Sequence, residues 1–257
     1  MKGLKGRVAL VTGATGLLGS AISLRFAEEE ATVAIASRSL PKAERWIEEN
    51  RNAGGTFIPA QLDLSSEGSI LNCLKQIADR AGTPAIVVAN ASLREGLTEP
   101  FENLTHDSFE KLFGVDIAGH VLLLRKTVDL LAGHCASFIF LSSIYAQTGV
   151  DHRIYPEAMA PTPVQYAAVK AAAEGVTRYL AALWGERGVR VNALVPGGIA
   201  AKERPSQEFV KRYSAKTMLR RMASADEVAS AAAFLASDEA SYITGQCLAV
   251  DGGMTAW

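Results

Sequence analysis

Short apolar runs alternate with longer amphipathic stretches along nearly the whole chain. A short apolar run is typical of a buried strand, whereas apolar residues recurring every third or fourth position are typical of a helix that covers a sheet. The pattern predicts strands at residues 7–11, 32–36, 57–62, 85–89, 137–141, 189–195 and 247–250, and helices at 20–30, 41–50, 66–80, 106–131, 164–184 and 225–237. This alternation predicts one α/β domain over residues 1–257, a doubly wound parallel sheet of about seven strands with helices on both faces.

Glycine and polar residues come directly after several of the expected strands. In a doubly wound sheet the carboxyl ends of the strands share one rim, and ligands bind there where the strand order reverses. We therefore expect one site at this rim. The residues that follow strands are Gly13, Asp63, Asn90, Ser143 and Pro196.

Two segments are expected to face a substrate, and the first of them interrupts the alternation. Residues 151–163 contain Pro156, Pro161 and Pro163, which exclude a helix. An ordinary surface loop is the alternative, but long ordered loops in compact domains are often functional. Residues 198–220 are the second segment.

Residues 12–19 form a glycine-rich turn between the first strand and the first helix. Glycines let the backbone approach a dinucleotide pyrophosphate, and the helix N-terminus adds N–H donors and a positive dipole end. A tight connection without a ligand would also use glycines. The residues expected to bind the cofactor here are Gly13, Thr15, Gly16, Leu17, Leu18 and Gly19.

Tyr166 and Lys170 lie four residues apart in an alanine-rich stretch that is predicted to be helical. They therefore share one helix face, and an ammonium close to a phenol stabilises the phenolate. Such a tyrosine can exchange a proton with a carbonyl or an alcohol. A surface pair is the alternative for this spacing alone, but the glycine turn in the same chain favours catalysis.

Composition argues against several other classes of function. The net charge is −1, which gives no reason to expect nucleic acid or an anionic membrane as a partner. No apolar run reaches membrane-spanning length, and the N-terminus lacks a signal-type apolar region. Cys73, Cys135 and Cys247 form no CxxC pair and are expected to be reduced, buried thiols of a cytoplasmic protein. The histidines and cysteines show no ligand spacing, so no metal is expected.

Together these motifs resemble the compact type of the short-chain dehydrogenase/reductase family, nearly from end to end. The resemblance implies a Rossmann-type fold and an NAD(P)-dependent oxidoreductase that acts on CH–OH donors. The matching residues are Tyr166 to Lys170 for the family's YxxxK, Ser143 for its serine, Asn90-Ala91-Ser92 for its N-A-G, Pro196-Gly197 for its PG turn, and residues 242–253 for its C-terminal signature.

The resemblance also implies roles for these residues. Tyr166 would be the general acid or base, Lys170 would hold the nicotinamide ribose, and Ser143 would polarise the substrate carbonyl. Asp63 has an alternative role as a helix N-cap, for which Ser65 competes. The other implied cofactor contacts are Asp63, Leu64, Asn90, Ala91, Ser92, Pro196, Gly197 and Ile199, in addition to Tyr166 and Lys170.

Three departures from the family pattern bear on the site. The glycines are spaced Gly-x-x-Gly-x-x-Gly, with Leu17 where the middle glycine is expected. Asp116 stands where an asparagine usually helps to hold a relay water near Lys170. It could act through its backbone carbonyl, or its carboxylate could pair with Lys170. The interval between Ser143 and Tyr166 is also longer than usual because of residues 151–163.

The preferred cofactor is expected to be NADP(H), with NAD(H) not excluded. An NAD enzyme tends to place an acidic residue at the end of the second strand, but this chain has Ser37-Arg38. A hydroxyl and a guanidinium suit a 2′-phosphate. The alternative is a solvated arginine at a strand end.

The substrate is expected to be small, polar and sugar-derived. The sequences around Tyr145, Tyr155 and Tyr166 are similar to a branch of oxidoreductases linked to bacterial surface-sugar and flagellin-glycan modification. Candidate substrate contacts are Ser143, Tyr145, His152, Arg153 and Tyr155. The long helices and the last strand imply a homo-oligomer, a tetramer or dimer.

Two rival functions remain open at the level of sequence. One is a cofactor-binding protein with little turnover, serving as a sensor or scaffold. The other is an epimerase or dehydratase whose tightly held cofactor is recycled. Retention of Ser143, Tyr166 and Lys170 favours a true oxidoreductase.

Overall fold

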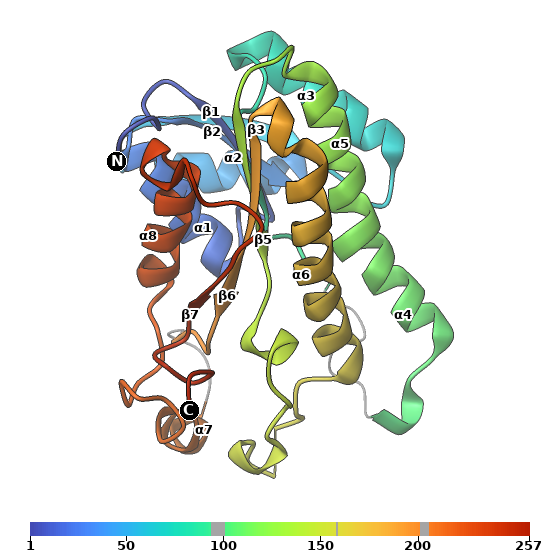
Figure 1. Ribbon diagram of the computed structural model, residues 1–257, viewed down its shortest axis with the longest axis vertical. Helices are drawn as coiled ribbons and strands as arrows, with labels where there is room; N and C mark the ends of the chain where they lie inside the picture. The colour runs from blue at the N-terminus through green and yellow to red at the C-terminus, as the bar shows by residue number, and fades with distance from the viewer. Residues whose placement is uncertain (94–100, 158, 201–205) are drawn as a thin grey trace.

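The computed structural model describes residues 1–93, 101–157, 159–200 and 206–257. In these residues the strands form one parallel sheet in the order β3-β2-β1-β4-β5-β6-β7 (Figure 1). The strands are β1 Val8–Thr12, β2 Thr32–Ser37, β3 Thr56–Gln61, β4 Ile86–Ala89, β5 Ala136–Leu141, β6 Val189–Pro196 and β7 Cys247–Val250. The α-helices are α1 Leu17–Glu28, α2 Leu40–Glu49, α3 Glu67–Ala81, α4 His106–Phe113, α5 His120–Leu130, α6 Val164–Trp184, α7 Gln207–Ser214 and α8 Ala225–Ala236. The predicted doubly wound architecture is confirmed.

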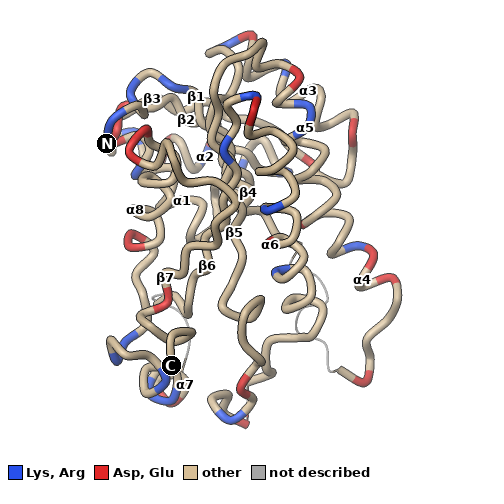
Figure 2. The backbone as a smooth tube through the Cα atoms, viewed as in Figure 1, with Lys and Arg blue, Asp and Glu red and all other residues tan. Residues whose placement is uncertain are grey.

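The central strands are apolar along their whole length because helices cover both faces of the sheet. All residues of β1, β4 and β5 are buried, and none of them is charged. This continuous burial is typical of parallel sheets. In Figure 2 the charged residues lie mainly on helices and end loops, with both signs interspersed. Pro59 is tolerated in β3 because β3 is an edge strand that pairs only with β2.

Two separate apolar cores flank the sheet. Alternate residues of β1 serve them: Leu10 packs in one core and Ala9 in the other. The core of Leu10 includes residues of α3, α5 and α6, whereas the core of Ala9 includes residues of α1, α2 and α8. Figure 1 accordingly shows α1 and α8 on one side of the sheet and α5 and α6 on the other.

The helix predicted at 106–131 is interrupted, which corrects that prediction. Residues Gly114–Gly119 form a π-helical turn between α4 and α5. At Gly119 an added Cβ would lie 2.4 Å from the carbonyl oxygen of Leu64, so only glycine allows this close approach. π turns inside helices often occur at functional sites. Asp116 lies in this turn and is buried.

The two segments expected to face a substrate pack on each other. Ile154 and Tyr155 join Phe209 and Tyr213 of α7 in a third apolar cluster, and Arg212 donates to the carbonyl oxygen of Tyr155. The prediction that residues 151–163 contain no helix needs one correction, because His152–Ile154 form a 3₁₀ turn ahead of the first proline. Residue 158 and residues 201–205 of these segments lie outside the described residues.

The start of α1 and the burial of one cysteine differ from the predictions. Helix α1 begins at Leu17, three residues before the predicted start. Cys73 is buried as expected, Cys247 is half-buried, and Cys135 is exposed, so the prediction of a buried thiol is wrong for Cys135. Within the described part of the chain, no helix combines the length and apolarity needed to cross a bilayer, and no three side chains of the metal-binding types converge.

Candidate active site

The glycine turn follows β1, and its backbone lies close to the loop that follows β4. Gly13 has a φ of +62°, which favours glycine. At Gly19 an added Cβ would lie 2.3 Å from the carbonyl oxygen of Gly13, so the turn cannot close with a larger residue. The turn is therefore fixed by two glycines, and the spacing that departs from the family pattern still gives a compact βα connection.

The N-terminus of α1 is left open by this turn. Gly16 is the N-cap and offers no side chain to the first N–H groups. By contrast, serine or threonine side chains cap α2, α3, α4, α7 and α8. Free N–H groups and the positive end of the helix dipole bind anions. Leu17 is half exposed at the first position of the helix, so the leucine that replaces a glycine does not fill this space.

Asn90 holds the glycine turn from the next strand of the sheet. Its Nδ2 donates to the carbonyl oxygens of Thr12 at 2.8 Å and Gly13 at 3.2 Å. The neighbouring Ala91 donates its backbone N–H to the Thr12 hydroxyl at 2.9 Å. The predicted Asn90 and Ala91 thus lie against the turn, and the role of Asn90 is architectural.

The ends of β2 and β3 place Ser37, Arg38 and Asp63 at the same rim. The Arg38 side chain is exposed, and its positive charge is among the influences that lower the pKa of Asp63. The largest cause is the Ser65 hydroxyl, which donates to Asp63 at 2.6 Å. Neither Asp63 nor Ser65 caps α3, because Ser66 does. Arg38 is close to Asp63 yet remains open to solvent. Leu64, beside them, is buried against the π turn at Gly119.

Tyr166 and Lys170 do share one face of α6. The ammonium nitrogen of Lys170 lies 5.4 Å from the centre of the Tyr166 ring. Lys170 is buried, and its Nζ donates to the carbonyl oxygen of Leu141 at the end of β5 at 2.9 Å. A buried ammonium beside a half-buried phenol is the arrangement that the spacing of the two residues predicts.

Ser142 and Ser143 follow β5 but have different partners. Ser142 Oγ lies 3.1 Å from both the Lys170 carbonyl oxygen and Glu174 Oε1, so its hydroxyl is engaged with α6. Ser143 Oγ accepts from the backbone N–H of Tyr145 at 3.3 Å and donates to no described residue. The Ser143 proton is therefore free for a ligand, which supports the choice of Ser143 over Ser142.

Asp116 is brought to Lys170 by the π turn. Its Oδ1 accepts from the backbone N–H of Leu93 at 2.9 Å, and its Oδ2 lies 3.8 Å from Lys170 Nζ. Burial raises the pKa of Asp116, and the charge of Lys170 partly offsets this effect. The Ser92 hydroxyl also lowers the pKa of Asp116, although Ser92 Oγ and Asp116 Oδ2 form no hydrogen bond of good geometry with any described residue.

His120 is the functional candidate that sequence reasoning missed. It is fully buried on α5, four residues after Asp116, and makes two hydrogen bonds of 2.9 Å. Nδ1 contacts the Asp116 carbonyl oxygen, and Nε2 contacts Thr12 Oγ1. Burial lowers the pKa of His120 to about 4. The only sequence signal was a histidine one helical turn beyond the unusual Asp116.

The predicted substrate residues separate into two groups. The hydroxyls of Tyr145 and Tyr155 form a hydrogen bond of 2.7 Å, and the Tyr155 hydroxyl forms another with Thr162 Oγ1 at 2.8 Å. Burial raises the pKa of Tyr145, which stays a neutral phenol. His152 and Arg153 are exposed, and Arg153 pairs with Asp151 at 2.8 Å. No described contact brings His152 or Arg153 to Ser143 or Tyr166.

The turn after β6 closes the rim on the other side. Gly197 donates its N–H to the carbonyl oxygen of Val250 at 3.0 Å, which follows on from the pairing of Pro196 with Val250. Ile199 forms an isolated bridge with Ala223. These contacts place the three predicted residues at the carboxyl end of β6, on the same rim as the glycine turn.

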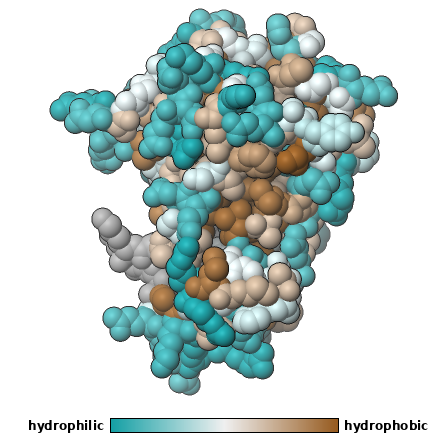
Figure 3. All heavy atoms as spheres, turned by 60° about the vertical axis from the view of Figure 1, so that its left-hand side comes forward, coloured by the Kyte–Doolittle hydropathy of each residue, from teal (hydrophilic) through white to brown (hydrophobic). Residues whose placement is uncertain are grey.

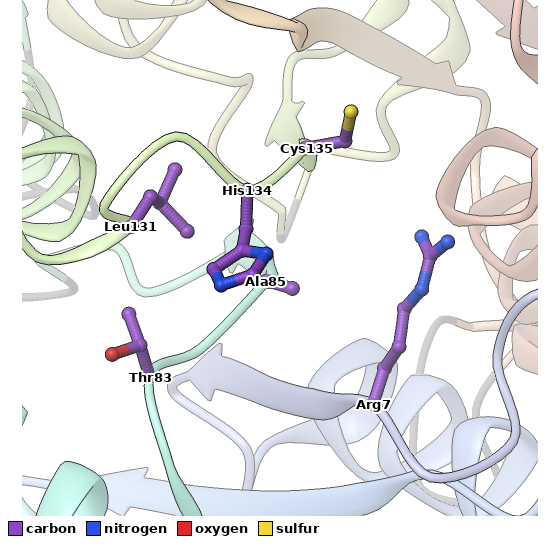
Figure 4. Close-up of a pocket in the computed structure, with 6 residues that line it drawn as sticks. All are labelled: Arg7, Thr83, Ala85, Leu131, His134 and Cys135. Carbon is purple, nitrogen blue, oxygen red and sulfur yellow. The ribbon is translucent and has the colours of Figure 1, made fainter.

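A separate hollow lies at the opposite end of the sheet. It measures about 470 Å³ and is lined by residues that precede β1, β4 and β5 (Figure 4). Its Arg7 is paired with Asp238 at 2.7 Å. Because ligands of doubly wound sheets bind at the carboxyl ends of the strands, this hollow is not the candidate site. Its lining residues are Arg7, Thr83, Ala85, Leu131, His134 and Cys135.

The residues of the rim fit a dinucleotide. The uncapped start of α1 offers N–H donors for a pyrophosphate, and the close approach at Gly19 keeps side chains away from it. Ser143, Tyr166 and Lys170 lie beyond β5, beside the point where the strand order reverses between β1 and β4. A dinucleotide with its pyrophosphate at α1 would extend toward these three side chains.

Known proteins are similar to this chain in sequence and in fold. A family model described as enoyl-(acyl carrier protein) reductase matches residues 13–255. A glucose 1-dehydrogenase of Gluconobacter oxydans is 33% identical over 97% of this chain and 92% of its own length. A short chain dehydrogenase from Leptospira borgpetersenii, solved with bound NAD⁺, is 29% identical, with a TM-score of 0.85 over 98% of this chain and 93% of that one. A gluconate 5-dehydrogenase from Burkholderia cenocepacia, solved with NADP and tartrate, is 27% identical, with a TM-score of 0.83 over 98% and 96%.

Proposed function

This chain belongs to the short-chain dehydrogenase/reductase family of NAD(P)-dependent oxidoreductases, and we propose that it interconverts a carbonyl and a secondary alcohol with NADP(H) as the preferred cofactor. The observation that carries the proposal is the arrangement at the end of β5. There the uncommitted hydroxyl of Ser143 and the paired Tyr166 and Lys170 lie on the rim that the glycine turn opens.

The preference for NADP(H) rests on the end of β2. Arg38 is exposed there and Ser37 is half-buried, and no acidic residue takes the place where a ribose diol would be bound. A guanidinium binds phosphate through charge-assisted hydrogen bonds. The neighbouring Asp63 is engaged by Ser65, so it leaves Arg38 available for a 2′-phosphate.

The proton chemistry is assigned to Tyr166. In reduction, the nicotinamide supplies the hydride to the carbonyl carbon. The Tyr166 hydroxyl gives its proton to the carbonyl oxygen, and the ammonium of Lys170 stabilises the phenolate that remains. Ser143 donates a hydrogen bond to the same substrate oxygen, where negative charge develops. Oxidation of the alcohol runs through the same residues in reverse.

Asp116 is proposed to act through its carboxylate. Its backbone carbonyl already accepts from His120 Nδ1, whereas its Oδ2 faces Lys170 at 3.8 Å. A carboxylate at this distance attracts the ammonium of Lys170, whose charge stabilises the Tyr166 phenolate. Of the two ways in which this residue could replace the usual asparagine, the pairing with Lys170 is therefore the better supported.

The substrate is proposed to be a small polyhydroxylated molecule of the sugar or sugar-acid kind. Relatives named for glucose and gluconate oxidation cover nearly the whole chain. The hydroxyls of Tyr145, Tyr155 and Thr162 are linked by hydrogen bonds and are polar groups that could meet such a substrate. Residues 151–163 with α7 would form the wall of this pocket.

We expect a cytoplasmic homo-oligomer. The edge strand β7 carries the exposed Leu248, and α6 carries the exposed Tyr179 and Leu183. In the view of Figure 3, apolar residues gather near the middle of the face and hydrophilic residues surround them. Exposed apolar surface of this kind marks protein interfaces, and a two-fold dimer or a tetramer would cover it. The reduced state of the three cysteines is the basis for the cytoplasmic location.

Substitution of Tyr166 by phenylalanine tests the proposal. Tyr166→Phe removes the proton donor but keeps the ring, so turnover of keto-sugars or sugar alcohols should fall by about 10³-fold or more. Binding of NADPH, followed by nicotinamide fluorescence, should stay within about threefold of the unchanged protein. Activity that survives in Tyr166→Phe would overturn the mechanism. A cofactor-binding protein without turnover would bind NADPH and show no activity before the substitution.

A further inference from the structure

We infer that His120 is a positioning residue that ties the π turn carrying Asp116 to the cofactor loops. The inference rests on the proposed function, since it concerns how Asp116 and Lys170 are held in the site. His120 contacts no group that would touch a substrate. Its two hydrogen bonds instead join two parts of the site that lie more than 100 residues apart in the chain, Thr12 and the π turn.

The hydrogen-bond pattern fixes where the proton of His120 lies. The Asp116 carbonyl oxygen can only accept, so Nδ1 must carry the proton and donate to it. Complete burial and the Lys170 charge lower the pKa of the ring, so Nε2 of the neutral ring has a lone pair that faces the Thr12 hydroxyl. The single proton of that hydroxyl has two acceptors in reach, Nε2 at 2.9 Å and the Val88 carbonyl oxygen at 3.2 Å, and the nearer one is Nε2. A neutral imidazole is suited to this position because it offers one donor and one acceptor on opposite sides of a rigid ring.

Thr12 extends this link into the cofactor loops. Its hydroxyl oxygen accepts the backbone N–H groups of Asn90 and Ala91, each at 2.9 Å. Asn90 in turn holds the carbonyl oxygens of Thr12 and Gly13. Both ring nitrogens of His120 and the Thr12 hydroxyl are therefore engaged, and together they join the glycine turn to the backbone of Asp116.

The π turn explains why a side chain can reach the Asp116 carbonyl. In the surrounding α-helix each carbonyl accepts from an N–H four residues on, but the N–H of His120 contacts the carbonyl of Ile117 instead. The Asp116 carbonyl then accepts from the His120 ring, which packs edge-on against Phe140 of β5. With the carbonyl held, the carboxylate projects toward Leu93 and Lys170.

Substitution of His120 by phenylalanine and asparagine tests this role. His120→Phe keeps a ring of similar size but removes the Nε2 contact of the Thr12 hydroxyl and the Nδ1 donor to the Asp116 carbonyl oxygen. Asparagine can place an N–H where Nδ1 lies. We expect His120→Phe to weaken NADPH binding about tenfold and to lower kcat about tenfold or more, with a shifted pH profile of kcat, and His120→Asn to restore most of the loss.

Thr127→Val is the matched control, because Thr127 is also buried on α5 and its hydroxyl donates only to Leu123 one turn earlier. It should lower the melting temperature without changing NADPH affinity or kcat. Hydrogen exchange without cofactor should speed up in His120→Phe at residues 114–119 and 90–93, and not across the sheet. If His120→Phe does not fold, the same link can be tested at Thr12. Thr12→Val removes the hydroxyl that contacts His120, whereas Thr12→Ser keeps it, so only Thr12→Val should show the loss.

A result in which His120→Phe matches Thr127→Val in NADPH affinity, kcat and exchange would overturn the inference. A shift in all of these readouts that asparagine does not restore would also overturn it, because the donor to Asp116 would then not matter. Failure of the proposed function is distinguishable. In that case the unchanged protein shows no turnover, while NADPH affinity and hydrogen exchange still report on His120.

Discussion

The residues of the site differ most in whether their polar groups are already engaged. Ser142 and Ser143 are adjacent and equally polar, yet only Ser143 keeps a proton that no described residue receives. His120 and Asp116 are both buried, but His120 is fully paired and Asp116 Oδ2 is not. The sequence motifs assign Ser143 and Asp116 to the candidate site, and this assignment stays a prediction. The sequence could not predict His120, because its partner Thr12 is remote in sequence and no local pattern joins them.

Adjacent serines offer a direct comparison. Ser143→Ala removes the donor to the developing oxyanion, so kcat should fall by about 10²-fold to 10³-fold with little change in melting temperature. Ser142→Ala should lower the free energy of unfolding by about 1 to 3 kcal/mol, because the buried Glu174 carboxylate loses a partner, and should leave kcat nearly unchanged. Steady-state kinetics and urea unfolding of both variants check this assignment. The reverse pattern would assign the substrate contact to Ser142.

The buried carboxyl of Asp116 predicts how stability changes with pH. Burial raises its pKa in the folded protein, so the folded state binds this proton more tightly than the unfolded chain does. The contribution of Asp116 to stability is therefore favourable at low pH and becomes unfavourable as pH rises above its ordinary value of 3.8. Asp116→Asn should raise the melting temperature, and by more at pH 8 than at pH 4, close to the ordinary pKa of the group.

Asp129→Asn serves as the control for that measurement, because Asp129 is an exposed carboxylate on α5. It should change the melting temperature little, and by similar amounts at both pH values. A rise in melting temperature for Asp116→Asn that becomes smaller as pH rises would contradict this prediction. It would mean that the ion pair with Lys170 stabilises the folded protein by more free energy than burial of the carboxylate costs.

Among the elements, strands and glycine turn were predictable, and the π turn was not. Apolar runs such as β4 and β5, which alternate with amphipathic helical stretches, favour the centre of a covered parallel sheet. A one-residue widening of a helix leaves no comparable pattern, since residues 114–119 fit an ordinary helix equally well. Gly119 at the end of the turn packs closely on Leu64, a contact between residues far apart in the sequence that no local pattern shows.

The close contact of Gly19 with Gly13 in the glycine turn leaves no room for a side chain. Gly19→Ala places a Cβ 2.3 Å from the Gly13 carbonyl oxygen, so the start of α1 must move and NADPH affinity should fall by about tenfold or more. Gly68→Ala is the matched control, since Gly68 also lies in the first turn of a helix and an added Cβ would meet only Ser66 Oγ at 3.9 Å. It should be neutral or stabilise the protein by about 0.5 to 1 kcal/mol. Equal affinities for the two variants would show that the turn tolerates a shift at α1.

The whole molecule places its chemistry at one end of the sheet. The residues assigned to the cofactor follow the carboxyl ends of strands or begin the next helix, and Asp116, Tyr166 and Lys170 come from helical segments at that same end. The hollow around His134 lies at the other end. The topology alone predicts this division, because it requires only the strand order. The identity of the substrate does not follow from topology. It depends on side chains of residues 151–163 and of α7, whose packing against each other the sequence pattern did not indicate.

Separate titrations of NADPH and NADH into the purified protein, followed by nicotinamide fluorescence, test the central claim most directly. NADPH should bind at least about tenfold more tightly than NADH, because a phosphate contact to arginine contributes about 1.5 to 3 kcal/mol. Arg38→Ala should remove most of that difference while leaving NADH affinity nearly unchanged. Equal affinities for the two nucleotides would contradict the assignment of Arg38, and binding of neither would contradict the cofactor site itself.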